Sequence, residues 1–240
     1  MFLLYWVHVA IRSVFYLAVI PGLLAFLLVF GVKEAPISGI AAKEKIDVSP
    51  RQFPTVYWKY LMVTALFGLG NSSNAFLILR TQDIGASLQM TILIYAAFNL
   101  IAALISYPAR SLFDSWVGKN VLLASFIIFL TSYLGFALTQ SAVFIAGSFV
   151  FYGLFQGIFR TAGKALASSF VPDPLRASGI GWYNTTVGVT QLIASLVAGQ
   201  LWDRVGHVAV FYYGAAFALF GALALSLLVS ERDQRAHRAV

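Results

Sequence analysis

Polar side chains recur at helical spacing inside stretches of this sequence that are otherwise apolar. In the stretch 142–165, Tyr152, Gln156, Arg160 and Lys164 follow one another every four residues, so a helix would carry them on one face. Their hydroxyl, amide and cationic groups can hydrogen-bond a polar molecule, but they offer no carboxylate or imidazole for proton transfer. This face therefore indicates binding rather than catalysis.

Three further apolar stretches carry amides in a similar way. The second stretch has two asparagines around a pair of serines, the third has one asparagine at its centre, and the sixth has an asparagine and a glutamine on one helical face. The candidate binding residues are Asn71, Asn74, Asn99, Tyr152, Gln156, Arg160, Asn184 and Gln191. One interpretation is a polar cavity. The alternative is that the amides only hold helices together, each bond contributing about 0.6–2 kcal/mol, and that Arg160 reaches to the membrane surface.

Sequence signatures of enzymes are missing. There is no His-Glu-x-x-His, no Gly-x-Ser-x-Gly and no Gly-rich phosphate loop with Lys, and the three His residues are far apart. The chain has no Cys, and no Asp or Glu lies inside an apolar stretch. We therefore expect no enzymatic activity, no metal, no cofactor and no proton-coupling group within the membrane.

The elements that must position these residues are seven apolar stretches. Each supplies about the 20 residues that a helix needs to cross a hydrocarbon core of about 30 Å. Hydrophobic residues make up 60% of the chain and charged residues 10%, with a mean hydropathy of +0.84. The sequence predicts an all-α, polytopic membrane bundle of seven transmembrane helices, at 13–31, 57–79, 89–108, 120–138, 142–165, 178–200 and 208–229.

The distribution of Lys and Arg predicts the orientation. If the spans cross alternately, one side collects twelve cations and the other only Arg12, Arg80 and Arg204, with Arg160 inside a span. Cytoplasmic loops carry the excess, so we expect a multi-pass protein of the plasma or inner membrane with its N-terminus outside and its C-terminus in the cytoplasm. The net charge of +7 is spread over loops without a basic run, which argues against a nucleic-acid partner.

Three loop segments carry a family resemblance. Residues 199–206 read Gly-x-Leu-x-Asp-Arg-x-Gly, residues 109–119 look like a degraded copy, and residues 160–181 include Arg-Thr-Ala-Gly-Lys, Val-Pro and Arg-Ala-Ser-Gly. Because these segments occur in this order and spacing, the chain resembles the C-terminal half of a major facilitator superfamily transporter, from the sixth to the twelfth helix.

That resemblance implies a domain organisation. Residues 1–31 would hold a leading segment and the sixth helix, 32–56 a cytoplasmic central linker, 57–230 the six-helix C-terminal half and 231–240 a cytoplasmic tail. The missing partner would be an N-terminal six-helix half, so we expect the sequence to be incomplete. A small solute would bind between the halves, which rock within the lipid bilayer.

The loop motifs imply residues for conformational gating, namely Asp114, Lys119, Asp203 and Arg204. The sequence departs from the family pattern in the first motif, which has Arg110, Ser115 and Val117 at three of its usual positions. The complete motif at Asp203 falls on the outer side by span counting, where it would form a tight turn between helices.

The sequence leaves three functions open. The first is a secondary transporter of permease or efflux type, for which the aromatic residues Phe151, Tyr152, Phe155, Trp182 and Tyr183 indicate an amphipathic solute. The second is a seven-helix receptor, although the last span lacks an Asn-Pro pair and a Lys for a retinal link. The third is a membrane subunit without transport activity.

Overall fold

The computed structural model describes residues 50–115 and 118–230, and single helical positions between residues 16 and 30; of residues 110–117, no side chain is described. The chain divides into two units, residues 1–45 and 46–240. In the first unit the rings of Phe26 and Phe30 meet edge to face, with centroids 5.1 Å apart. Most of the predicted first span, most of the central linker and the tail lie outside the described residues.

The described part of the second unit consists of helices joined by short loops, with no strand, which confirms the all-α class. In lipid the backbone has no water to bond to, and an α-helix satisfies the backbone hydrogen bonds within its own segment. The helices are α3 (Thr55–Gly68), α4 (Ala75–Asp83), α5 (Leu88–Ser115), α6 (Gly118–Leu138), α7 (Ala142–Ser169), α8 (Arg176–Arg204) and α9 (His207–Leu228), with short 3₁₀ turns at Pro50–Gln52 and Asp173–Leu175.

Four of these helices are long and apolar enough to cross a membrane, namely α5, α6, α7 and α9. The number of seven spans therefore stays a prediction. The predicted second span at 57–79 is not one helix, because α3 ends at Gly68 and α4 begins at Ala75. The predicted sixth span corresponds to α8, which has 29 residues but carries many polar side chains.

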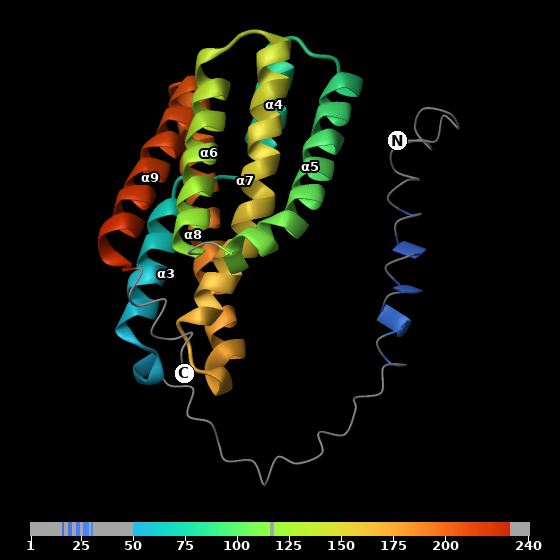
Figure 1. Cartoon of the computed structure of the whole chain (residues 1–240). Coiled ribbons are helices and arrows are strands. Elements are labelled where there is room, and N and C mark those ends of the chain that lie inside the picture. Colours follow the sequence, from blue (N-terminus) through green and yellow to red (C-terminus); the bar gives the residue numbers. More distant parts are fainter. Residues whose placement is uncertain are drawn as a thin grey trace. The chain divides into compact units, whose positions relative to one another are not determined.

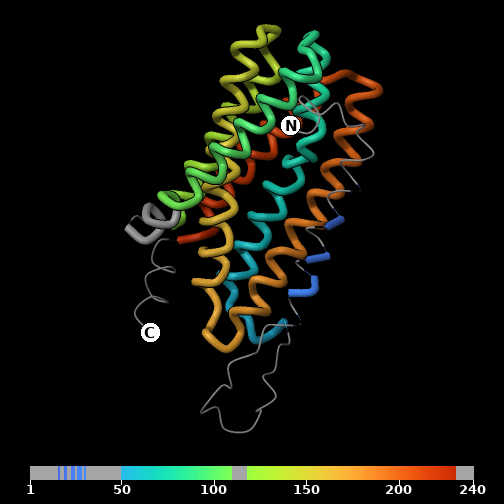
Figure 2. Tube along the Cα trace, turned by 90° about the vertical axis from the view of Figure 1, so that its right-hand side faces the viewer, coloured from blue at the N-terminus to red at the C-terminus, as the bar shows by residue number. Residues whose placement is uncertain are grey.

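The helices of this unit run side by side along its length (Figure 1). Helix α7 packs between α5 and α6, while α9 packs against α6 and α3. Helix α8 lies against α3, and Figure 2 shows these two segments running together. The α6–α7 connection lies at one end of the unit and the α7–α8 connection at the other.

Aromatic rings fill the space between α3, α6 and α7. The ring of Phe67 stacks on Phe126 with centroids 4.0 Å apart and meets Phe129 and Phe155 at 5.0 and 5.7 Å. All four side chains are buried. Aromatic pairs of this kind contribute about 0.5–1.5 kcal/mol beyond the burial of their surface.

Two glycines in α7, Gly153 and Gly157, allow α5 to approach closely. A side-chain carbon at Gly153 would lie 2.8 Å from the carbonyl oxygen of Phe98, and one at Gly157 would lie 2.5 Å from that of Ala102. Both distances are shorter than contact distance, so only glycine allows this approach. The stretch of α7 that carries Tyr152 and Gln156 is thereby fixed against α5.

Two tyrosines fix the other side of α3. The hydroxyl of Tyr57 donates to the carbonyl oxygen of Gly179 on α8 at 2.6 Å, and that of Tyr60 donates to the carbonyl of Gly163 on α7 at 2.8 Å. Both tyrosines are buried. These bonds tie together the ends of three helices at the side where α7 turns into α8.

Candidate functional site

A helix interruption forms the centre of the candidate site. Residues 69–74 separate α3 from α4 and belong to neither helix (Figure 2). The amides of Leu69, Gly70 and Asn71 still donate back to the carbonyls of Ala65, Phe67 and Gly68, but the amide of Ser73 instead donates to the hydroxyl oxygen of Ser195 on α8, at 3.0 Å. Broken helices occur at membrane depth only where protein or a cavity satisfies the backbone.

The interruption brings two predicted site residues together. The hydroxyl of Tyr152 on α7 donates to the side-chain oxygen of Asn74 at 2.5 Å. Tyr152 is buried and Asn74 is partly buried. Ser195 on α8 accepts a hydrogen bond from the neighbouring residue, Ser73. The interruption, α7 and α8 therefore meet at residues 73 and 74.

Asn71 is the third predicted residue at this point. Its side chain is 8% exposed, and its Oδ1 atom is buried without a hydrogen-bond partner among the described residues. A buried acceptor left unpaired costs about 1–3 kcal/mol. This oxygen is therefore free to accept a hydrogen bond from, or to bind, a group outside the described residues.

The other five predicted binding residues do not join this cluster through any described contact. Gln156 is buried on α7. Asn99, Arg160, Asn184 and Gln191 are exposed on the surface of this chain. The amide of Asn99 donates to the carbonyl of Tyr95 in its own helix at 2.8 Å.

Arg160 is exposed and makes no ion pair with a described residue. It lies nine residues before Ser169, where α7 ends. At 1.5 Å per residue that is about 14 Å from the helix end. The helix is thus longer than the sequence predicts, and Arg160 lies farther from its end.

The predicted gating residues are separated in the structure. Lys119, at the start of α6, donates to the carbonyl of Ser226 on α9 at 2.9 Å. Asp203 and Arg204 end α8 and are exposed, and neither pairs with a described residue. The side chain of Asp114 lies outside the described residues.

The complete loop motif ends in a tight turn, as predicted. Gly206 has a φ of 115°, a left-handed conformation that side chains rarely adopt, and it joins α8 directly to α9. The amides of Val205 and Gly206 both bond to the carbonyl of Leu201, at 2.9 Å. This geometry explains the glycine at the end of the motif.

Sequence reasoning missed a charged cluster at the same end of the unit. Arg80 on α4 is fully buried. Its guanidinium donates to the carbonyls of Phe136 and Thr139, at 3.1 and 2.7 Å, and to Asp83 at 2.8 Å. The Nδ1 atom of His207 lies 3.1 Å from the same carboxylate oxygen.

This cluster joins α4 to the end of α6 and the start of α9. The sequence analysis placed Arg80 in an outer loop, where a cation would be solvated. The signal that could have identified it was the Arg–x–x–Asp spacing at the end of a span, because residues three apart are neighbours on a helix.

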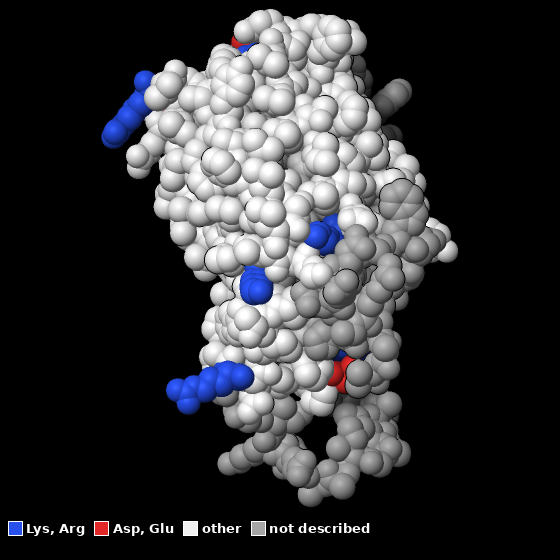
Figure 3. All heavy atoms as spheres, turned by 60° about the vertical axis from the view of Figure 1, so that its left-hand side comes forward, with Lys and Arg blue, Asp and Glu red and all other residues white. Residues whose placement is uncertain are grey.

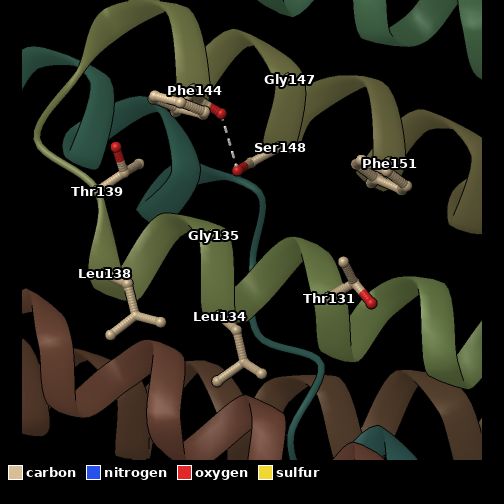
Figure 4. Close-up of a pocket in the computed structure, with 9 residues that line it drawn as sticks. All are labelled: Thr131, Leu134, Gly135, Leu138, Thr139, Phe144, Gly147, Ser148 and Phe151. Carbon is tan, nitrogen blue, oxygen red and sulfur yellow. Dashed lines mark hydrogen bonds between the residues drawn. The ribbon is translucent and has the colours of Figure 1, made fainter.

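A groove of about 440 Å³ lies between α6 and α7, and its lining includes Thr139, whose carbonyl accepts a hydrogen bond from Arg80. Figure 4 shows Thr131, Gly135 and Thr139 on one side of it and Gly147 and Ser148 on the other. Leu138 and Phe144, at its edge, are 69% and 70% exposed. It is a shallow, mostly apolar groove on the outside of the bundle, and none of the predicted site residues lines it.

The charges on the surface are few. In Figure 3 most of the visible surface is uncharged, with Lys and Arg as separate spots and Asp or Glu only near the two ends. A surface of this kind suits contact with lipid. Among the described residues no group of three His, Cys, Asp or Glu could hold a metal ion.

Comparisons with known proteins agree with this picture. The sequence is 30% identical over 231 residues to an uncharacterised MFS-type transporter of Methanocaldococcus jannaschii. The match covers 94% of this chain but 57% of the relative, so the chain spans little more than half of that protein's length. The sequence model of the Major Facilitator Superfamily matches residues 60–240. The chain therefore belongs to the major facilitator superfamily of membrane transport proteins.

Proposed function

We propose that the chain is the C-terminal part of a secondary transporter that carries a small organic solute across the membrane. The observation that supports this most is the interruption at 69–74, where Asn74, Tyr152 and Ser195 join three segments by hydrogen bonds. In transporters, interrupted helices with free polar groups mark the binding site near the middle of the bilayer.

The solute path would be bordered by the residues that the sequence predicts. Asn71, Asn74, Tyr152 and Gln156 would form its inner wall, since the structure buries or partly buries them. Asn99, Arg160, Asn184 and Gln191 would face an N-terminal half, since this chain leaves them exposed. A charged side chain at membrane depth costs at least about 2.5 kcal/mol by insertion scales, so Arg160 facing lipid would be unfavourable.

The domain organisation follows from the same proposal. Residues 57–230 would be the C-terminal half, residues 1–31 would hold the preceding helix, and residues 32–56 would be the cytoplasmic linker. The two halves would rock about the solute site. The bond from Lys119 to the carbonyl of Ser226 would hold α6 to α9 during this motion, while Asp114, Asp203 and Arg204 would act at the loops.

Cysteine labelling tests the path without knowledge of the solute. The chain has no Cys, so single cysteines can be introduced without background. In the complete protein, Asn184→Cys and Gln191→Cys should react with a water-soluble methanethiosulfonate reagent. The matched control is Leu219→Cys, on an exposed apolar position of α9, which should stay unreactive because lipid surrounds it.

Two outcomes would contradict the proposal. Unreactive cysteines at both 184 and 191 would show that no aqueous path borders α8. Equal reactivity at 184, 191 and 219 would show that the reagent reaches the surface generally. Loss of solute flux in Arg160→Ala and in Arg160→Lys would further support binding by the planar guanidinium, which Lys cannot replace.

A further inference from the structure

We infer that the interruption at 69–74 binds a monovalent cation of the size of Na⁺, with the side-chain oxygen of Asn71 as a ligand. This inference concerns binding and goes beyond the proposed solute path. A role of that ion in driving transport would rest on the proposed function.

The first step is the side chain of Asn71. It is 8% exposed, and Oδ1 is buried without a hydrogen-bond partner among the described residues. The neighbouring amide, Asn74, is already bonded through its oxygen to Tyr152. The side-chain oxygen of Asn71 is thus free to bind a group from outside the described residues, whereas that of Asn74 is not.

The second step is the backbone around Asn71. The carbonyls of Leu69, Asn71 and Ser72 accept no hydrogen bond from any described residue, because the helix that would supply their donors ends at Gly68. Together with Oδ1 they give four acceptor oxygens within four consecutive residues. Unwound carbonyls and the C-terminal ends of half-helices are the groups that coordinate Na⁺ in other broken transporter helices.

The third step is the enclosure of the segment. A side-chain carbon at Gly70 would lie 2.9 Å from the carbonyl of Gly214 on α9, so α9 covers one side at close range. On another side, Ser73 bonds to Ser195 of α8. These contacts enclose the segment on two sides, which favours a small ion at Asn71 itself, with the proposed solute path running beside it.

The fourth step is the charge of the ion. The four oxygens are neutral, whereas Mg²⁺ and Ca²⁺ sites in proteins use carboxylates. The described Asp residues with side chains in place lie at helix ends or in a loop, and two of them are paired with arginines. Arg80, on the helix that follows, is bound to two carbonyls and Asp83, so it cannot serve the interruption.

Thermal unfolding of the full chain in detergent, without any solute, tests the inference. The comparison is NaCl against equimolar KCl and choline chloride, at constant ionic strength and pH 8. A ligand that binds only the folded state stabilises it by RT ln(1 + [L]/Kd), so Tm should rise and saturate with Na⁺ but not with choline.

Three variants locate the response. Asn71→Leu should abolish the Na⁺-dependent rise in Tm. Asn71→Asp, which keeps the shape and adds a charged oxygen, should retain the rise and shift its midpoint to lower Na⁺ concentration. The matched control Gln89→Leu removes an exposed amide at the start of α5 and should respond as the unmodified chain does.

Equal Tm values in Na⁺ and choline would overturn the inference, as would a full Na⁺ response in Asn71→Leu. An Asn71→Asp variant that binds Na⁺ no better would also overturn it, because Oδ1 would then not be the ligand. If Tm responds to Na⁺ through Asn71 while the cysteines at 184 and 191 stay unreactive, the cation site is supported and the proposed solute path is contradicted. If those cysteines react but Tm does not respond to Na⁺, the solute path is supported and the cation site is contradicted.

Discussion

At the scale of single residues, the bond between Tyr152 and Asn74 is the direct link between α7 and the interruption. Tyr152→Phe removes the donor at 2.5 Å and leaves the Asn74 oxygen unpaired. Side-chain hydrogen bonds inside membrane proteins average about 0.6 kcal/mol and reach about 1.7. We expect a loss of stability near the upper value, measured as a lower Tm in detergent.

The control for that measurement is Tyr107→Phe. Tyr107 is 87% exposed on α5, so its hydroxyl should contribute little. A Tyr152→Phe variant as stable as Tyr107→Phe would show that the bond carries no net energy and would weaken the role of Asn74 in positioning α7.

Arg80 offers the second prediction at this scale. Arg80→Leu removes three donors and leaves the carbonyls of Phe136 and Thr139 without partners. Each unpaired buried acceptor costs about 1–3 kcal/mol, so the variant should lose a large part of the stability of the unit. The matched control is Arg204→Leu, an exposed arginine at the end of α8, which should change Tm little.

Arg80→Lys separates charge from geometry. Lysine keeps the positive charge but cannot direct five donors in a plane, so it should recover only a part of the lost stability. Full recovery would show that charge alone matters, and that the bonds to both carbonyls are dispensable.

At the scale of helices, α7 depends on its glycines. Gly157→Ala places a carbon 2.5 Å from the carbonyl oxygen of Ala102, and a backbone atom cannot rotate away. We expect about 1–3 kcal/mol of destabilisation from overpacking, seen as a lower Tm. Gly188→Ala, on α8 with nothing within 4 Å, should instead be neutral or slightly stabilising, because alanine favours the helix. Similar effects at both positions would argue against the close α5–α7 contact.

Several helices could be predicted from the sequence to within a few residues. The stretches 120–138 and 208–229 correspond to α6 at Gly118–Leu138 and α9 at His207–Leu228. Uninterrupted hydropathy sets these boundaries, since leaving the helix within lipid would expose backbone groups. The same rule led to one helix at 57–79, where the structure has two.

That difference has a local cause. Gly68, Gly70 and the run Asn71-Ser-Ser-Asn74 are poor helix formers, and the polar side chains compete for backbone bonds. The hydropathy of the flanking residues masks this signal. The identity of Asn71 and Asn74 as site candidates could be predicted, but their place outside a helix could not.

Contacts between segments that are far apart in the sequence could not be predicted from the sequence. Tyr152 and Asn74 are 78 residues apart, and Arg80 bonds to carbonyls 56 and 59 residues away. No spacing rule connects such positions. Arg160 and Gln191 are exposed on this chain, so under the proposed function their surroundings would depend on an N-terminal half.

At the scale of the whole molecule, the charge bias makes a prediction about orientation. Cysteine at Ser38, within the predicted cytoplasmic linker, should be protected from an impermeant thiol reagent in intact cells. Cysteine at Ser87, an exposed position between α4 and α5, should react. The reverse pattern would invert the predicted topology, and reaction at both sites would show that the cells leak.

The last prediction concerns the chain as a unit of function. Rocking about a central site needs two halves, whereas the chain spans 57% of the length of its archaeal relative. By itself the chain would present Arg160, Asn184 and Gln191 to lipid or to a second copy. We therefore expect the 240-residue chain to carry no flux in proteoliposomes, measured with the solute that the complete protein transports.

Co-expression with an N-terminal six-helix half should restore that flux, because the exposed polar face would then border a closed path. A matched control replaces Arg160 by Ala in the restored complex. The control should lower flux without lowering the amount of complex, if the guanidinium faces the path. Solute flux by the purified chain alone would instead show that it works as an assembly of identical copies, with the polar faces of two chains turned toward each other.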